Sequence, residues 1–176
     1  MRATRFIDAL NDQIANEFAA SHQYTAIGAH YEAQTLPQLA RFFYAQGVEE
    51  RGHAMMMIKY LLDTDSPVRL REVTAPKAEF ADHIAPIRHA LEQERTVSGQ
   101  IGELFAVARE EHDYLSEQFV QWFLKEQVEE EATMLELLDV AERVRDQPMT
   151  LEEYIAREQP GGDHTDPLAP EQAGAA

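Results

Sequence analysis

Residues 48–57 read VEERGHAMMM and lie between two apolar runs, LARFFYA at 39–45 and MMMIKYLL at 55–62. Glu50 and His53 are three residues apart, so on an α-helix they share one face. The same face carries Phe43 and Met57. Because burying a carboxylate is costly unless it is paired, polar groups at the centre of an apolar face need a reason. The stretch therefore predicts a helix with a polar site in its buried face.

Four segments share this arrangement, in which apolar residues recur at spacings of three and four and polar residues interrupt them at the centre. The first segment covers residues 4–34, the second begins near Pro37, the third covers 87–108 and the fourth 119–141. Four long amphipathic helices predict an all-α four-helix bundle. The central polar residues are, in chain order, Glu17, Glu50, His53, Glu94, Gln127 and Glu130.

The connections between these segments predict the topology of the bundle. The short links QTLPQ (34–38) and EEHDY (110–114) predict two antiparallel hairpins, with Asp113 as the N-cap of the fourth helix. Residues 64–82 contain two prolines and show no helical period. Such a loop can extend along the whole bundle, which would make the second and third helices parallel.

The C-terminal part of the chain predicts a short helix and a tail. Pro148 is followed by TLEEYIARE (150–158), in which Thr150 and Glu153 have the spacing of a capping box. Residues 159–176 contain no apolar period and predict a flexible tail. We therefore expect one domain over residues 1–158, including the crossover loop, followed by the tail.

Composition limits the classes of function. The 176 residues, 44% apolar, suffice for one buried core, and the absence of cysteine excludes disulfides and thiolate metal sites. The net charge of −17 argues against nucleic-acid and anionic-membrane partners and suits cations. The N-terminal residues MRATRFIDALNDQ contain neither a secretory apolar region nor a membrane span. We expect a soluble, cytoplasmic protein.

The central polar residues form an internal repeat with a constant offset of 77 residues. The offset relates Glu17 to Glu94, Glu49 to Glu126, Glu50 to Gln127, and His53 to Glu130. Two hairpins of equal register, packed about a pseudo-two-fold axis, would bring these groups to one level of the core. The repeat is imperfect, because the Glu-x-x-His of the first half is Gln-x-x-Glu in the second.

Four carboxylates at one buried level must share protons or a cation, because each desolvated charge costs on the order of several kcal/mol. Carboxylates with one imidazole suit first-row divalent metals such as iron. The spacing predicts two metal ions, with Glu17 and Glu94 as terminal ligands and Glu50 and Glu130 as bridges. The imperfect repeat predicts that the two metal sites are unequal.

Two motifs, EERGHAMM (49–56) and QWFLKEQVEEEATML (121–135), resemble those of the bacterial non-haem ferritins when Glu17, Tyr24 and Glu94 are taken in register. The similarity covers residues 4–158, and the tail resembles the extended C-terminus of the actinobacterial type. It implies a ferritin-like fold and a shell of twenty-four subunits. It also implies oxidation of Fe(II) by dioxygen or hydrogen peroxide and storage as a ferric oxyhydroxide mineral.

The resemblance further implies roles for individual residues. It implies no haem, since Arg51 stands where a bacterioferritin has its haem-binding methionine. Tyr24 resembles the tyrosine that supplies an electron beside the di-iron centre. The implied iron ligands are Glu17, Glu50 and His53 for the first ion, Glu50, Glu94 and Glu130 with Gln127 alongside for the second, and Glu49, Glu126 and Glu129 for a third, inner-surface ion.

Two other functions stay open at this point. The chain is alternatively a catalytically silent helical scaffold whose core acids are protonated, or a small di-iron oxidase acting on another substrate. Glu49, Glu126 and Glu129 are alternatively ordinary exposed acids in a Glu-rich segment, and Tyr24 a packed core aromatic.

Overall fold

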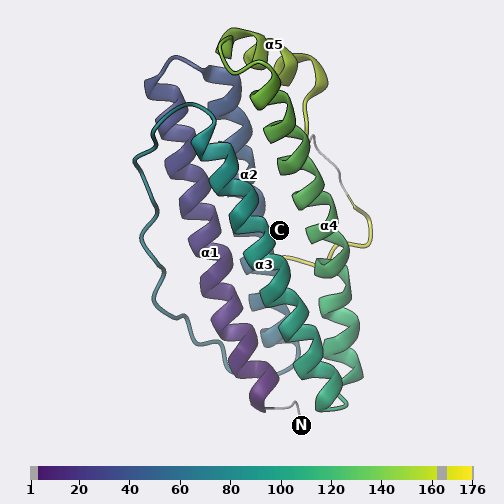
Figure 1. The fold of residues 1–176 in the computed structure, drawn as a ribbon. Helices are drawn as coiled ribbons and strands as arrows, with labels where there is room; N and C mark the ends of the chain where they lie inside the picture. The colour runs from purple at the N-terminus through teal and green to yellow at the C-terminus, as the bar shows by residue number, and fades with distance from the viewer. Residues whose placement is uncertain (1–3, 162–165, 176) are drawn as a thin grey trace.

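The computed structural model describes residues 4–161 and 166–175, and within them the regular structure is α-helical. The five helices are α1 (Thr4–Ala33), α2 (Pro37–Asp63), α3 (Ala85–Glu110), α4 (Tyr114–Arg143) and α5 (Pro148–Glu158). Figure 1 shows α1 to α4 side by side as a bundle, with α5 lying at one end. The predicted all-α four-helix bundle with a short fifth helix is confirmed.

The chain runs through the bundle as two antiparallel hairpins, α1 with α2 and α3 with α4. Residues 64–84 pass along the outside from one end of the bundle to the other (Figure 1). The second and third helices are consequently parallel, as the length of the loop predicts. Gln23 of α1 fixes this loop through two hydrogen bonds of 2.8 Å with the backbone N–H and C=O of Lys77.

The core consists of two apolar clusters separated by the central polar residues. One cluster, at the α5 end, contains Tyr31, Phe43 and Leu137. The other, toward the N-terminus of α1, contains Phe6 and Met57. Most apolar residues of the four predicted helix faces are buried in these clusters, and Tyr60 and Phe119 pack against one of them partly buried, so burial of apolar surface holds the helices around the polar level.

The helix ends confirm one predicted cap and correct another. Asp113 caps α4, because its side chain accepts a hydrogen bond from the backbone N–H of Ser116. The capping box predicted at Thr150 and Glu153 is wrong, since Gln147 is the N-cap residue of α5 and Glu153 is exposed. Pro148 instead occupies the first turn, where its missing N–H costs nothing.

Glu152 of α5 has a role that local spacing does not reveal. Its side chain is 4% exposed and accepts hydrogen bonds of 2.8 Å from the backbone N–H groups of Gln38 and Leu39. These N–H groups lie in the first turn of α2, which lacks a side-chain cap of its own. Glu152 therefore caps α2 and fastens α5 to the bundle.

Replacing Glu152 with Ala is expected to lower the free energy of unfolding by about 1–2 kcal/mol, because it leaves two N–H groups of α2 without their acceptor. Chemical denaturation measures the change. Glu153→Ala is the matched control and should stay within about 0.5 kcal/mol of the unmodified chain, because Glu153 is exposed. Equal stability of the two variants would contradict the capping role.

The tail is packed against α2 and α4, whereas its composition predicts flexibility. Asp166 accepts hydrogen bonds from Nε1 of Trp122 (3.1 Å) and Nζ of Lys125 (3.2 Å). Farther along, the N–H of Ala173 donates to the carbonyl of Met55 at 3.1 Å. Residues 166–175 pack through these single contacts, and such packing needs no helical period in their sequence. The flexibility of the tail stays a prediction.

The docking of the tail has an optical signature, because Trp122 is the only tryptophan of the chain. Asp166→Ala removes the acceptor of its indole N–H and should shift the tryptophan emission to longer wavelength. Asp139→Ala, an exposed residue of the same helix, is the control and should leave the spectrum unchanged. An unshifted spectrum in Asp166→Ala would show that the tail leaves Trp122 unaffected in solution.

Candidate metal centre

The structure brings the six predicted di-metal residues together between the two apolar clusters. They come from all four long helices, so neither hairpin holds the set alone. Each side chain is withdrawn from solvent, with exposed fractions of 5% or less. The residues are Glu17 of α1, Glu50 and His53 of α2, Glu94 of α3, and Gln127 and Glu130 of α4.

The first half of the centre is formed by Glu17, Glu50 and His53. One ligand atom from each lies within 4.8 Å of the others. Nδ1 of His53 is 3.1 Å from Oε2 of Glu50, as the helical spacing of the two residues allows. These separations would let one ion contact all three residues, and their role as the first metal site stays a prediction.

The second half of the centre is centred on Glu94. Its carboxylate accepts a hydrogen bond from Nε2 of Gln127 at 3.2 Å and another from the hydroxyl of Tyr24. The amide nitrogen of Gln127 also approaches the backbone carbonyl of Glu94 at 3.3 Å. Gln127 therefore orients Glu94 through its nitrogen, and Tyr24 lies directly at the centre.

A further cluster adjoins the first and differs from the predicted third site. Ligand atoms of Glu49, His53, Glu126 and Glu130 lie within 4.8 Å of one another. Glu129 is exposed and lies 3.5 Å from Nζ of Lys125, outside this group. The structure thus keeps Glu49 and Glu126 of the prediction and joins them to His53 and Glu130.

Three carboxylates of the centre, those of Glu50, Glu94 and Glu130, have raised pKa values. Burial, followed by the charges of Glu94 and Glu17, raises the pKa of Glu50 well above its usual value. The pKa of Glu130 is raised in the same way by burial and by Glu94 and Glu50. Burial raises the pKa of Glu94 to about 6, although the hydrogen bonds from Tyr24 and Gln127 oppose the change. A bound cation would remove this penalty.

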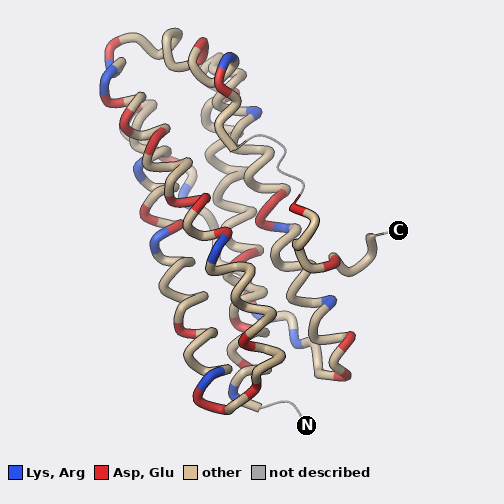
Figure 2. Tube along the Cα trace, turned by 90° about the vertical axis from the view of Figure 1, so that its right-hand side faces the viewer, with Lys and Arg blue, Asp and Glu red and all other residues tan. Residues whose placement is uncertain are grey.

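Two neighbouring groups respond to the same charges. Burial and the nearby carboxylates, first Glu94, raise the pKa of the Tyr24 phenol, so the residue is protonated at neutral pH. Burial also raises the pKa of Glu126, against the opposing effect of His53. Figure 2 shows the acidic residues spread along the height of the bundle, which adds a diffuse negative field around the centre.

Two glutamines to which the sequence pattern assigned no role donate hydrogen bonds to predicted ligands. Nε2 of Gln13 donates to Oε1 of Glu17 at 2.8 Å, and Nε2 of Gln46 donates to Oε2 of Glu49 at 2.7 Å. Each pair is four or three residues apart on one helix, which is the only sequence signal of the contact. Such partners fix the orientation of ligating carboxylates.

The chemistry of the donor set suits divalent first-row ions. It offers carboxylate oxygens and one imidazole, with no thiolate. Because the pKa values of Glu50, Glu94 and Glu130 are raised, binding of a cation to these acids would favour release of protons. None of the helices within residues 4–161 and 166–175 is long and apolar enough to cross a membrane.

Comparison with known proteins agrees with the fold. The family profile described as the ferritin-like domain matches residues 7–144. The chain therefore belongs to the ferritin family. Its similarity to curated relatives shows that it is a bacterial non-haem ferritin, and these are iron-storage proteins.

Two such relatives cover most of the chain. Ferritin BfrB of Mycolicibacterium smegmatis is 47% identical over 173 residues, which are 98% of this chain and 95% of the relative. The bacterial non-heme ferritin of Staphylococcus aureus strain MRSA252 is 34% identical over 154 residues, 88% of this chain and 93% of the relative. An open pore ferritin from Archaeoglobus fulgidus superposes with a TM-score of 0.86 at 28% identity, covering 89% of this chain and 98% of that one.

Proposed function

We propose that the protein stores iron by oxidising Fe(II) to Fe(III) at the buried centre and depositing the product as a ferric oxyhydroxide mineral. One observation carries the proposal: three helices, α1, α2 and α4, gather carboxylates and one histidine into two adjacent groups that share His53. Acids with raised pKa values in a dry core are poised to exchange protons for cations. Membership of the ferritin family supports iron as that cation.

In this proposal Glu17, Glu50 and His53 bind one ferrous ion. Glu94 and Glu130, with Glu50 as a bridge and Gln127 holding Glu94, bind the second. Each ferrous ion gives one electron to dioxygen, so two ions, one dioxygen and four waters yield two FeOOH units, one hydrogen peroxide and four protons. The protein fixes both ions and stabilises the positive charge that grows on oxidation. Tyr24, hydrogen-bonded to Glu94, is placed to supply a further electron.

The cluster of Glu49, His53, Glu126 and Glu130 is the proposed next position of the iron. It shares two residues with the oxidation centre and includes the partly exposed Glu49 and Glu126. An ion can therefore leave the buried centre by exchanging one carboxylate at a time. We extend the proposal to a homo-oligomeric shell of twenty-four subunits in the cytoplasm, which the family likeness supports.

Aerobic loading tests the proposal. The purified protein, freed of metal with a chelator, is given increasing Fe(II) in air while ferric absorbance, iron per subunit and particle size are followed. The expected result is a shell-sized particle that retains far more iron than its ligand residues can bind. Iron that stays at or below that stoichiometry would contradict storage, and an absorbance rise equal to that of protein-free buffer would contradict oxidation.

A further inference from the structure

A cavity of about 470 Å³ lies between the first half of α2 and α5 with the turn that follows it. We call it the α2/α5 pocket. Its walls include Phe42 and Gln46 of α2, Ile155 of α5 and Pro160 of the turn. The six residues of the metal centre do not line it. The pocket is therefore a separate feature of the fold, at the end of the bundle where α5 lies (Figure 1).

The turn after α5 closes one side of the pocket. Gln159 and Gly161 have positive φ angles of 47° and 65°, and both residues line the pocket. A Cβ atom added to Gly161 would lie 3.6 Å from Cε2 of Phe42 and 3.9 Å from Nε2 of Gln46. The backbone of the turn thus packs directly on two residues of α2, which gives the pocket a backbone wall on this side.

The lining combines an apolar surface with a single charge. Phe42, Ile155 and Pro160 supply apolar atoms, and the described lining residues include one charged side chain, the exposed Arg41. Asp and Glu are absent from these residues, although the whole chain has a net charge of −17. An anionic group beside Arg41 is therefore attracted without repulsion from the lining itself. The surface fits a small molecule with an apolar body and a carboxylate.

Gln46 adds a requirement for a hydrogen-bond donor. Its side chain is 4% exposed, and its Nε2 donates to Oε2 of Glu49 at 2.7 Å. Because an ionised carboxylate only accepts hydrogen bonds, this contact assigns the nitrogen to the Glu49 side and leaves Oε1 as the free atom. Oε1 is buried and has no hydrogen-bond partner among the described residues. Such an acceptor is costly unless a donor reaches it, and a ligand hydroxyl in the pocket supplies one.

The spacing of these groups sets the size of the ligand. Arg41 and Gln46 are five residues apart, which is about 7.5 Å along the helix axis. Phe42 and Ala45 lie between them in the sequence and line the same pocket. A benzene ring that carries a carboxylate and a hydroxyl at opposite positions spans a comparable distance. Its ring can pack on Phe42, because aromatic pairs attract through offset or edge contacts.

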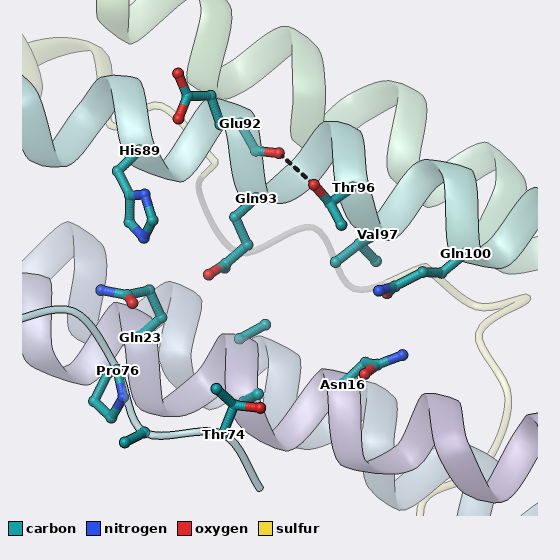
Figure 3. Close-up of a pocket in the computed structure, with 13 residues that line it drawn as sticks. Asn16, Gln23, Thr74, Pro76, His89, Glu92, Gln93, Thr96, Val97 and Gln100 are labelled. Atoms are coloured by element: carbon teal, nitrogen blue, oxygen red, sulfur yellow. Dashed lines mark hydrogen bonds between the residues drawn. The ribbon is translucent and has the colours of Figure 1, made fainter.

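A second cavity lacks this combination. It has a volume of about 390 Å³ and lies between α1 and α3, with the crossover loop at its edge (Figure 3). Its lining includes Glu92 but neither Lys nor Arg. Oε1 of Gln100 in its wall already lies 3.4 Å from Nε2 of Gln13, and Gln93, which has an unpartnered Nε2, is only partly buried. That lining favours no single class of ligand, whereas the lining of the α2/α5 pocket does.

We propose that the α2/α5 pocket binds a small aromatic hydroxycarboxylate. The carboxylate pairs with Arg41, the ring packs on Phe42, and the hydroxyl donates a hydrogen bond to Oε1 of Gln46. Because Nε2 of Gln46 holds Glu49, an occupied pocket also fixes the amide that orients one acid of the cluster beside the metal centre. The binding itself involves no iron, so the inference stands apart from the proposed function.

Titration calorimetry with 4-hydroxybenzoate tests the inference on the assembled full-length protein, freed of metal with a chelator. The carboxylate and hydroxyl of this probe lie on opposite sides of its ring, so they cannot chelate one ion together. We expect saturable binding with a Kd below about 1 mM. Benzoate, which lacks the hydroxyl, and 4-hydroxybenzamide, which lacks the charge, should each bind at least about fivefold more weakly.

Two variants locate the binding. Ala45→Trp places a large side chain at an exposed position of the lining and should abolish binding of 4-hydroxybenzoate. Arg41→Gln should weaken it by about fivefold or more and leave the affinity for 4-hydroxybenzamide within about twofold, because only the carboxylate needs the charge. Arg51→Gln is the matched control, an exposed arginine of α2 outside the lining, and should keep both affinities.

Four results would overturn the inference. They are the absence of saturable binding to the unmodified protein, equal affinity for benzoate and 4-hydroxybenzoate, an unchanged Kd in Ala45→Trp with wild-type melting and particle size, and equal losses in Arg41→Gln and Arg51→Gln. The last would show that net charge, and not the pocket, attracts the probe. Failure of aerobic iron loading would contradict the proposed function and leave these binding results unchanged, so the two proposals fail separately.

Discussion

Replacing Glu50 with Ala is expected to lower the initial rate of Fe(II) oxidation by at least about a hundredfold, because even partners behind a metal ligand cost up to about that factor. Glu50 lies within 4.8 Å of both Glu17 and His53 at their ligand atoms, so its loss opens the first group and removes the proposed bridge. His53→Ala should act as strongly, since His53 belongs to both clusters. Stopped-flow absorbance of the ferric product measures both rates.

The matched controls are Glu103→Ala and His22→Ala, which remove an exposed glutamate and an exposed histidine of α3 and α1. Both should oxidise iron at the wild-type rate, which shows that net charge alone does not set the activity. Wild-type initial rates in Glu50→Ala and His53→Ala would disprove the assignment of the centre. Circular dichroism confirms that each variant keeps its helices.

The second large effect concerns the metal-free protein, whose melting temperature should fall as the pH rises from about 5.5 to 7.5. Glu50, Glu94 and Glu130 have folded pKa values above the unfolded ones, so the folded chain holds more protons. Stability is therefore lost as pH rises from the unfolded pKa through the folded one. For Glu94, with a folded pKa of about 6, the loss is about 2 kcal/mol over the whole titration, of which about 1 kcal/mol falls above pH 5.5.

Groups whose pKa is lowered in the folded protein do not change the stability within this pH window. Asp82, Glu142 and Asp166 have lowered pKa values through hydrogen bonds or ion pairs, so their contribution is lost only below about pH 4. Calorimetry in the presence of a chelator measures the slope. Glu50→Gln and Glu130→Gln should each flatten it, and saturating Zn(II) should reverse it, because the ion displaces the protons. A melting temperature that rises with pH in chelator would contradict the raised pKa values.

The bundle was predictable because its signals are local and repeated. The expected first helix, 4–34, compares with Thr4–Ala33, and the second begins at Pro37 as predicted. The other two helices extend beyond the predicted 87–108 and 119–141 by a few residues, because the predicted ranges ended at the last residues of the apolar pattern, whereas the helices continue to Ala85–Glu110 and Tyr114–Arg143. The constant offset of 77 residues also predicted that the six central residues meet.

What escaped prediction depends on contacts between helices. Glu152 and Glu153 are alike in sequence, yet only packing of α5 on α2 decides which one reaches the N–H groups of Gln38 and Leu39. Similarly, Glu126 and Glu129 are three residues apart, and Lys125 pairs with Glu129 on the exposed face. The contacts of Gln13 and of Asp166 need the positions of distant side chains, which no periodicity supplies.

Because the predicted ligands are divided between the two hairpins, an ion bound by them would connect one hairpin to the other. Glu17 and Glu50 belong to one hairpin, Glu94 and Glu130 to the other, and the long crossover is their only covalent connection. An ion held by both halves is thus a reversible cross-link across the interface of the hairpins. Under the proposed function, each iron ion that binds both halves would stabilise the bundle and its release would remove that stabilisation, so iron turnover and the stability of the fold would be coupled.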